Sequence, residues 1–306
     1  MLNIRRQKKR VQDPTADKVF HVLNYTFLTI VAIVILMPLM NVVSSSLSDP
    51  WALGRGSVRL FPVGFNLEAY RLLLNQQTLM TGFYNTIFYT VTGTTLNVVI
   101  TVMCAYPLSR NDLVGRKLIM FYFTFTMLFS GGMIPTYLLI HSLGLLNTRL
   151  VMILPGAMSI FNMIIARTFF INSIPNELNE AGEIDGASDF QLILFVILPL
   201  AKPIIAVLTL FYAQGHWNSF FNAFLYLTNP NLFNLQVVLR NFITNIAAML
   251  DASVYVGTIA EAQEIALMQN VVRYAVIVFT SIPIIMVYPF AQRYFIKGVM
   301  IGSLKG

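Results

Sequence analysis

The stretch VLNYTFLTIVAIVILMPLMNVV, residues 22–43, runs for 22 residues without an acidic or basic side chain. A helix needs about 20 mostly apolar residues to cross the hydrocarbon core of a bilayer, so this stretch predicts a transmembrane helix. Further apolar stretches lie at 85–107, 118–140, 150–170, 196 to about 227, and 271–290. The sequence therefore predicts an all-α membrane protein with six transmembrane helices.

Composition excludes a water-soluble protein of this length. Charged residues make up 11% of the 306 residues, against about 25% in typical soluble domains, while hydrophobic residues reach 57% and the mean hydropathy is +0.70. The net charge of +7 does not indicate a nucleic-acid partner, because the basic residues gather at the ends of the apolar stretches. Such placement is typical of Lys and Arg retained on the cytoplasmic side of a membrane.

The basic residues also predict the orientation of the chain. Several precede the first apolar stretch, as in a secretion signal, but that stretch exceeds a signal core of about 7 to 15 residues and no small-residue cleavage site follows it. The stretch is therefore expected to remain as the first span. With the N-terminus inside, 14 of the 20 Lys and Arg fall in cytoplasmic segments, which predicts a multi-pass plasma-membrane protein with both termini cytoplasmic.

This orientation divides the chain into segments. The expected order is a basic cytoplasmic tail (1–21), the first span (22–43), an extracytoplasmic loop or ordered cap (44–84), a core of five spans (85–290) and a cytoplasmic C-terminal tail (291–306). Within the core we expect a cytoplasmic loop at 171–195 and an outer loop at 228–270.

Two of the predicted spans carry features beyond hydrophobicity. The span at 85–107 has a stripe of small polar residues at helical spacing, which predicts close packing with another helix: Thr90, Thr94, Asn97 and Thr101. The span at 118–140 is interrupted by Ser-Gly-Gly at 130–132 and then by Pro135, which frees backbone groups that protein or water must satisfy. A packed kink is one interpretation, and a moving hinge or a substrate contact is the other.

The cytoplasmic loop contains the most informative sequence, SIPNELNEAGEIDGASDFQ at 173–191. Ser173 as a cap, with Pro175 in the first turn, predicts a short helix from Asn176 to Asp185 that ends at Gly186. Small residues in the middle of this helix, Ala181 and Gly182, suggest that something large packs closely against it. A solvated acidic helix would explain the charges of this loop but not its small-residue surface.

These residues resemble the cytoplasmic loop signature of ABC importer permeases. Glu180-Ala181-Gly182 is followed by Asp185-Gly186, then by nine residues, and then by Val196-Ile197-Leu198-Pro199. Gly182 stands where the family usually has a second Ala, and Val196 where it usually has Ile. Stretches at 129–137, 144–149 and 295–306 resemble the carbohydrate branch of the family, the maltose-type permeases, and within it those that serve complex oligosaccharides in Gram-positive bacteria.

The resemblance implies a type I ABC importer permease architecture in a bacterial cell membrane. The implied partners are a homologous second permease subunit, two ABC ATPase subunits, an extracytoplasmic solute-binding protein and membrane lipid. The implied activity is alternating-access import of a sugar or oligosaccharide, with no cofactor on this chain and with ATP and Mg on the ATPases. The residues implied to dock the ATPase are Glu180, Ala181, Gly182, Ile184, Asp185, Gly186, Ala187, Leu198 and Pro199. The ending at 298–306 is expected to add a second contact.

The sequence provides no signal for catalysis by this chain. It contains no phosphate-binding loop, no Gly-x-Ser-x-Gly motif and no metal-ligand spacing among its three histidines and its single cysteine, Cys104. We therefore expect no catalytic residue and no metal site. A secondary transporter or channel is the alternative class, but it usually needs ionisable residues within spans, and the core parts of these spans carry none apart from residues near their ends and His216.

The fifth predicted span contains the candidate substrate contacts. Amides at steps of four, Gln214, Asn218 and Asn222, are expected on one helix face, with Trp217 and Phe221 on the adjacent face. His216 lies among them and is expected to be packed rather than reactive. Amides beside aromatic rings suit a sugar pathway, but they also suit an interfacial aromatic belt with amides bonded to the second permease. Both interpretations stay open at this point.

Overall fold

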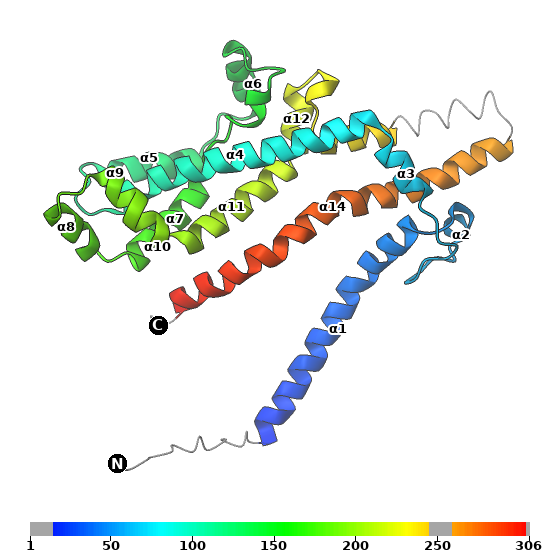
Figure 1. The fold of residues 1–306 in the computed structure, drawn as a ribbon, viewed down its shortest axis with the longest axis horizontal. Coiled ribbons are helices and arrows are strands. Elements are labelled where there is room, and N and C mark those ends of the chain that lie inside the picture. Colours follow the sequence, from blue (N-terminus) through cyan, green and yellow to red (C-terminus); the bar gives the residue numbers. More distant parts are fainter. Residues whose placement is uncertain (1–14, 245–258, 304–306) are drawn as a thin grey trace. The chain divides into compact units, whose positions relative to one another are not determined.

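The computed structural model of the protein describes residues 15–244 and 259–303, and these residues form helices and connecting turns without a β-strand (Figure 1). The chain divides into two compact units, Met1–Tyr70 with Gly257–Val278, and Arg71–Val256 with Phe279–Gly306. Each unit is described by itself.

The first unit is built around helix α1 (Thr15–Ser46), whose side chains are exposed from residue 17 to residue 40. An apolar surface of this length is suited to lipid. The expected loop after it is an ordered cap. Ser44 donates a hydrogen bond to the carbonyl of Leu60 (2.7 Å), and Ser48 accepts one from the amide of Val63 (3.0 Å). Helix α2 (Pro50–Gly54) is capped by the Asp49 carboxylate.

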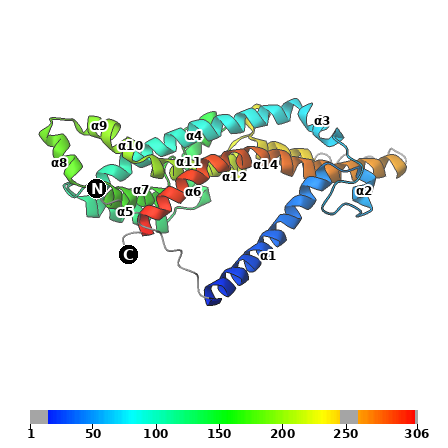
Figure 2. The same cartoon turned by 60° about the horizontal axis from the view of Figure 1, so that its bottom comes forward.

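The core of the second unit is a layer of three helices, α4 (Gln77–Ser109), α7 (Ile160–Ser173) and α11 (Lys202–Trp217) (Figures 1 and 2). The polar stripe predicted in the second span lies on α4 and bonds across this layer. Thr101 and Tyr212 of α11 share a hydrogen bond of 2.6 Å, and the Asn97 amide donates to the carbonyl of Gly156 (3.3 Å). The stripe therefore packs and bonds to neighbouring segments, as predicted.

The expected third span is two helices in the structure. Helix α5 ends at Leu128 (Arg116–Leu128), α6 begins at Met133 (Met133–Ser142), and the two are bent by 111°. The break follows from Gly132, whose φ of +83° is open to glycine but strained for other residues. The interruption seen in the sequence is therefore a full change of direction and not a kink within one helix.

The expected fourth span also begins later than its apolar sequence does. Residues Arg149–Met152 form a 3₁₀ turn, η1, and the α-helix α7 starts only at Ile160, where the Ser159 hydroxyl accepts from the amide of Asn162. The preceding loop is held by Asn147, which has a φ of +56° and whose side-chain oxygen accepts from the amides of Thr228 and Asn229. Apolar composition alone could not separate this packed loop from a helix.

The expected fifth span is a succession of short elements. The range from 196 to about 227 contains the end of a π-turn η2 (Ile193–Ile197), α10 (Leu198–Leu200), α11 and α12 (Phe220–Tyr226), while α9 (Asp189–Leu192) lies before it and η3 (Pro230–Leu232) lies after it. The α9–α10 segment and α11 are bent by 82°. Prolines in the first turns of α10 and α11 lack the N–H that would continue the preceding helix. Residues 235–244 are again helical, within the expected outer loop.

Helix α14 (Ile259–Ser303) covers the expected sixth span and extends beyond it in both directions. Within the described residues, three helices are long and apolar enough to cross a membrane, and the two bent pairs raise the number to five. Helix α7 is apolar but has 14 residues. The count of six spans and the side of each loop stay predictions. Residues 1–14 lie outside the described residues. In the predicted second contact at 298–306, residues 298–303 form the end of α14, and their side chains and residues 304–306 are not described.

Candidate functional site

The loop at 171–195, predicted to be cytoplasmic, contains the predicted short helix, α8 (Glu177–Ile184), but the predicted cap is wrong. Ser173 is the last residue of α7, and Asn176 occupies the cap position of α8 without a side-chain hydrogen bond. The reason is that α7 continues through Ser173, so the hydroxyl of that residue lies at the end of one helix instead of the start of the next. Helix α8 and α9 lie at the C-terminal end of α4 (Figures 1 and 2).

The end of α8 is the prediction that the structure confirms most directly. Gly186 has a φ of +71°, its amide donates to the carbonyl of Glu183 (3.1 Å), and the amide of Ala187 donates to the carbonyl of Gly182 (2.9 Å). This pair of bonds is the Schellman arrangement that terminates helices at a left-handed glycine. The chain then starts α9 at once through a capping box between Ser188 and Gln191.

The small residue Gly182 has an explanation within the chain. A Cβ on Gly182 would lie 2.6 Å from the Cδ1 of Leu192, a buried residue of α9. The large group that packs closely on this position is therefore Leu192, and not only a partner protein. What α8 leaves exposed is the remainder of its predicted docking surface, namely Glu180, Ala181, Ile184, Asp185 and Gly186. Ile184 is 86% exposed, which is unusual for an aliphatic side chain outside the lipid-facing helices.

The second half of the sequence signature has a different location. Ile197 is fully buried, and Val196 and Leu198 pack against the same core as α4 and α7, whereas Pro199 is exposed. Ala187 is half-buried at the turn between α8 and α9. The signature therefore joins an exposed segment, the one predicted to dock the ATPase, to a buried attachment, and Leu198 belongs to the attachment.

Arg110 connects the docking loop to α4, and sequence reasoning did not find it. Its guanidinium forms salt bridges with Asp112 (2.7 Å), Glu183 of α8 (2.9 Å) and Asp189 of α9 (3.0 Å). The Arg110 side chain is 15% exposed, while the three carboxylates are 64%, 64% and 83% exposed. The hydrogen bonds that the Arg110 guanidinium donates to Asp112 and Glu183 raise the pKa of Arg110, and the same guanidinium lowers the pKa of Asp112.

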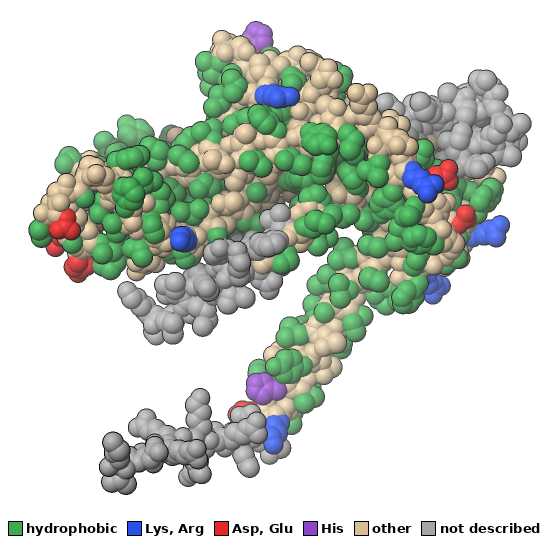
Figure 3. All heavy atoms as spheres, in the orientation of Figure 1, with side chains coloured by type: hydrophobic (Ala, Val, Ile, Leu, Met, Phe, Trp, Pro, Cys, Tyr) green, Lys and Arg blue, Asp and Glu red, His purple; other side chains and the backbone are tan. Residues whose placement is uncertain are grey.

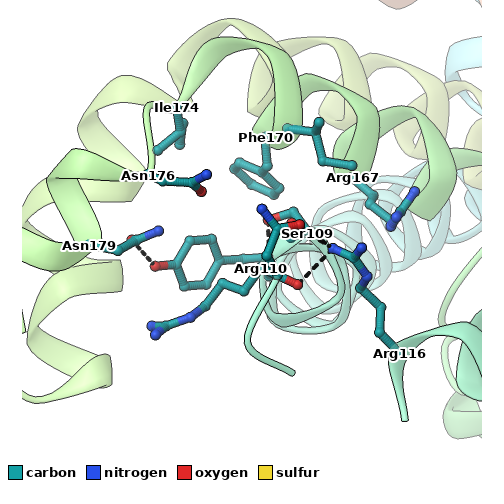
Figure 4. Close-up of a pocket in the computed structure, with 11 residues that line it drawn as sticks. Ser109, Arg110, Arg116, Arg167, Phe170, Ile174, Asn176 and Asn179 are labelled. Carbon is teal, nitrogen blue, oxygen red and sulfur yellow. Dashed lines mark hydrogen bonds between the residues drawn. The ribbon is translucent and has the colours of Figure 1, made fainter. Parts of the chain in front are cut away.

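A hydrogen bond between Tyr106 and Asn179 also joins α4 to α8, beside the Arg110–Glu183 salt bridge. The Tyr106 hydroxyl donates to the side-chain oxygen of Asn179 (2.7 Å), and the Tyr106 ring packs edge-on against Phe170 (Figure 4). Tyr106 in the last turn of α4 and Arg110, the C-cap residue of α4, are four residues apart in sequence, and Asn179 and Glu183 are four residues apart on α8, so the bonded residues match in sequence spacing. We call these four residues the α4–α8 clamp.

The cavity beside the clamp, of about 170 Å³, is lined by further arginines (Figure 4). Arg116 donates to the carbonyl of Arg110 (2.8 Å), and Arg167 of α7 donates to the carbonyl of Leu108 (2.8 Å). The last carbonyls of a helix lack intrahelical partners and lie at its negative end, so cations are favourable there. These two arginines therefore bind free carbonyls at the C-terminal end of α4, next to the residues of the clamp.

The predicted amide face of the fifth span is not continuous. Helix α11 ends at Trp217, Asn218 is its C-cap residue, and α12 starts in a new direction at Phe220. Asn222 therefore does not continue the row of Gln214 and Asn218, because the helix breaks between them. The exposed members of the predicted set are Gln214, Asn218, Phe221 and Asn222.

Trp217 and His216 are packed rather than exposed. The Trp217 ring is 7% exposed and lies edge-on to Phe83, with centroids 6.2 Å apart. The His216 ring lies so close to Gly93 of α4 that a Cβ there would collide with it. Within the described residues, neither the His216 Nε2 nor the Trp217 Nε1 has a hydrogen-bond partner, and the same holds for polar atoms on the facing stripe of α4, in Thr90, Thr94 and Asn97. The interface of α4 and α11 is thus unusually polar for a helix pair in lipid.

Residues 9–301 match a protein family described as "Binding-protein-dependent transport system inner membrane component". The chain belongs to this family. Its members are membrane components of transport systems, so this permease is a transport subunit and not an enzyme.

The permease is similar over nearly its whole length to several characterised relatives. It is 38% identical to the polygalacturonan/rhamnogalacturonan transport system permease protein YtcP of Bacillus subtilis, over 95% of this chain and 99% of the relative. It is 40% identical to protein LplC of the same species, over 95% and 96%. A solved bacterial ABC transporter involved in the import of the acidic polysaccharide alginate contains a chain with 36% identity and a TM-score of 0.80, over 92% of this chain and 98% of that one.

In this permease the sequence predicted the short helix α8 and its end at Gly186 better than the contacts that attach the helix to α4. The signature residues are easily recognised in sequence, whereas the α4–α8 clamp joins residues 73 positions apart. The available signal was the placement of Arg110 directly after an apolar stretch and the acidic composition of 177–189, but neither fixes a distance.

Proposed function

We propose that this chain is the membrane-spanning permease subunit of an ATP-driven importer for an acidic oligosaccharide, which an extracytoplasmic solute-binding protein delivers. The observation that carries the proposal is near-full-length similarity, at 36–38% identity, to one permease named for polygalacturonan and rhamnogalacturonan and to one transporter for alginate. Polygalacturonan and alginate are both polymers of uronic acids. Alternating access would carry a shorter fragment of such a polymer through the permease.

The proposed assembly contains a homologous second permease and two ABC ATPase subunits that hold ATP and Mg. Three features of this chain support the ATPase contact: the exposed Ile184 on α8, the helix end at Gly186, and the clamp that joins α8 to α4. An aliphatic residue exposed beside acidic ones suits a groove with an apolar floor and a basic rim. Movement of that groove would then be transmitted through Arg110 and Tyr106 to α4.

The test is reconstitution of the complete transporter in liposomes. Labelled oligogalacturonide should accumulate only when the permease, its partner permease, the ATPases, ATP and the loaded binding protein are all present. Omission of ATP, or an ATPase variant that cannot hydrolyse it, should abolish accumulation. Accumulation driven by an imposed ion gradient without the ATPases would instead show a secondary transporter.

The proposed topology places both termini in the cytoplasm, and it predicts the side on which cysteines react. In a Cys104→Ala background, Ser57→Cys should react with an impermeant maleimide from outside, and Val114→Cys only after the membrane is opened. Both positions are exposed, and Val114 is 92% exposed, so accessibility does not limit labelling. Ser188 in the cytoplasmic loop is left unchanged because it caps α9. Labelling of Val114→Cys from outside in sealed cells would invert the orientation.

The fifth-span region is proposed to line part of the sugar pathway, and its exposed amides can be substituted to test this. Gln214→Ala with Asn218→Ala should lower oligosaccharide uptake about thirtyfold, because each lost amide removes a hydrogen bond to a sugar hydroxyl worth about 1 kcal/mol, and about 2 kcal/mol is lost in all. ATP hydrolysis and subunit assembly should persist. The matched control is Asn75→Ala, an exposed amide outside this region. Normal uptake by the double variant would assign these amides to a subunit interface. Trp217 is unsuitable for this test, because its truncation would open a buried cavity.

A further inference from the structure

Acidic residues are absent from long segments of the second unit. Residues 69–111, 113–176 and 190–250 contain no Asp or Glu. Three arginines lie in these acid-free segments away from the predicted cytoplasmic loop, and all are exposed: Arg71, which is three residues from Glu68, and Arg149 and Arg240, which have no acidic residue nearby in sequence. On the face drawn in Figure 3, the region of α6 and α12 shows basic and histidine side chains but no acidic one. Within the described residues, neither Arg149 nor Arg240 has a salt bridge to a carboxylate.

Arg149 and Arg240 are each held over an aromatic ring. The Cζ of Arg149 lies 5.1 Å from the ring centroid of Phe88, and the Cζ of Arg240 lies 4.8 Å from that of Phe224. Phe88 is 40% exposed and Phe224 is 49% exposed. A cation–π contact orients a guanidinium without supplying an acceptor for its N–H groups. The contact therefore leaves the N–H donors of each arginine free for an anion.

The two ring-and-guanidinium pairs, Arg149 with Phe88 and Arg240 with Phe224, border one core cluster. Each of the four residues lies close in sequence to a buried member of that cluster, which contains Tyr89, Val151, Ala223 and Val237. The pairs are therefore fixed on a single packed body, which also carries the stacked rings of Phe220 and Phe224. Exposed rings beside guanidinium groups offer a sugar acid both an apolar surface for its C–H groups and a planar fork for its carboxylate.

We propose that Arg149 and Arg240 bind the carboxylates of the oligosaccharide as it enters the permease, so that these two positions determine the preference for an acidic sugar. The inference rests on the proposed function and names the residues that recognise the negative charge of the transported sugar. Lipid phosphates and acidic side chains of the binding protein carry the same kind of charge, and the experiment separates them.

The first experiment compares two sugars of equal length in the reconstituted transporter: a trigalacturonide, and its carboxyl-reduced analogue, which keeps the hydroxyls and loses the charge. Arg149→Gln and Arg240→Gln should each lower trigalacturonide uptake about tenfold, since a hydrogen-bonded charge contributes roughly this factor. Uptake of the reduced sugar should change less than twofold. Arg149→Lys, which keeps the charge without the fork, should lose less than Arg149→Gln. The control is Arg71→Gln, an exposed arginine outside both pairs.

The second experiment measures equilibrium binding of trigalacturonide to the purified complex without binding protein. The double Gln variant should bind it at least about tenfold more weakly than the wild type. Unchanged binding would overturn the proposal and assign any loss of uptake to docking of the binding protein. An equal loss of uptake for both sugars would also overturn it and indicate anchoring in lipid. A wild-type transporter that imports only the neutral sugar, or neither sugar, would overturn the proposed function together with this proposal, whereas wild-type import of trigalacturonide that both Gln variants retain in full would overturn this proposal alone.

Discussion

Replacing Gly186 with valine is expected to abolish the rise in ATP hydrolysis that sugar-loaded binding protein causes in the assembled transporter. A β-branched residue at a φ of +71° is strained by at least about 1–2 kcal/mol, and relief of that strain would break the two bonds that end α8. The start of α9 would shift with them, because the capping box begins two residues later. The exposed surface of α8 would then no longer present one fixed shape to the ATPase.

The measurement is ATP hydrolysis with and without loaded binding protein, on complexes purified with all subunits. Gly115→Val is the matched control, because Gly115 has a φ of +78° and open space around it but lies outside the docking segment. Gly186→Asn should keep most of the stimulation, since asparagine tolerates this conformation. Full stimulated hydrolysis and transport in Gly186→Val would refute the role assigned to α8.

Charge reversal at Glu180 tests the same contact without a change in the backbone. Glu180 is exposed, so Glu180→Lys leaves the packing of the chain intact and alters only what the ATPase meets. We expect both Glu180→Lys and Glu180→Gln to lower the stimulation of ATP hydrolysis by loaded binding protein. Low ionic strength should restore part of this stimulation only in Glu180→Gln, because that variant removes the charge without reversing it.

Removal of Arg110 is the second change with a large expected effect. Arg110→Ala would leave three carboxylates without their shared cation and would remove one of the two points at which α8 is tied to the end of α4. Salt bridges to such exposed carboxylates contribute about 0–1 kcal/mol each, so the complex should still fold and assemble. The loss should be in coupling: basal hydrolysis persists, while stimulated hydrolysis and uptake fall about tenfold or more.

A double-mutant cycle identifies the partner. Arg110→Gln should lose most of its effect in a background that already carries Glu183→Gln and Asp189→Asn, because the interaction is then absent before the arginine is changed. Tyr106→Phe, which removes only the hydroxyl bonded to Asn179, should weaken coupling further when combined with Arg110→Gln. Purely additive effects in the first cycle would show that Arg110 acts through a different group.

The sequence predicted those parts of the fold that depend on local composition. The first two spans are uninterrupted apolar helices, and the turn at Gly186 depends on a single residue with a positive φ. Prediction from sequence failed where contacts with other segments of the chain determine the local structure. Ser173 has the chemistry of a cap, yet it ends α7, and the apolar residues after Arg149 form a loop that Asn147 fixes through distant amides.

Prediction of the candidate site was limited in the same way to features that lie close together in sequence. The docking residues could be named because the signature is contiguous, but the close neighbour of Gly182 is Leu192, which only folding brings next to it. The break after Trp217 removed Asn222 from the expected amide face, since helical spacing holds only while the helix continues. Arg110 was missed because an ion pair over 73 residues leaves no trace in local spacing.

The way in which α8 and α9 are fastened has a mechanical consequence. The C-terminal end of α8 and the start of α9 are closed by bonds within the loop, the two helices are in tight contact at Gly182, and the clamp ties α8 to the end of α4 at two points. Such a segment has low compliance, so a displacement applied at Ile184 is not absorbed by bending of the loop. Because the loop is already ordered before a partner arrives, little conformational entropy is lost on association, and more of the contact free energy remains for moving α4.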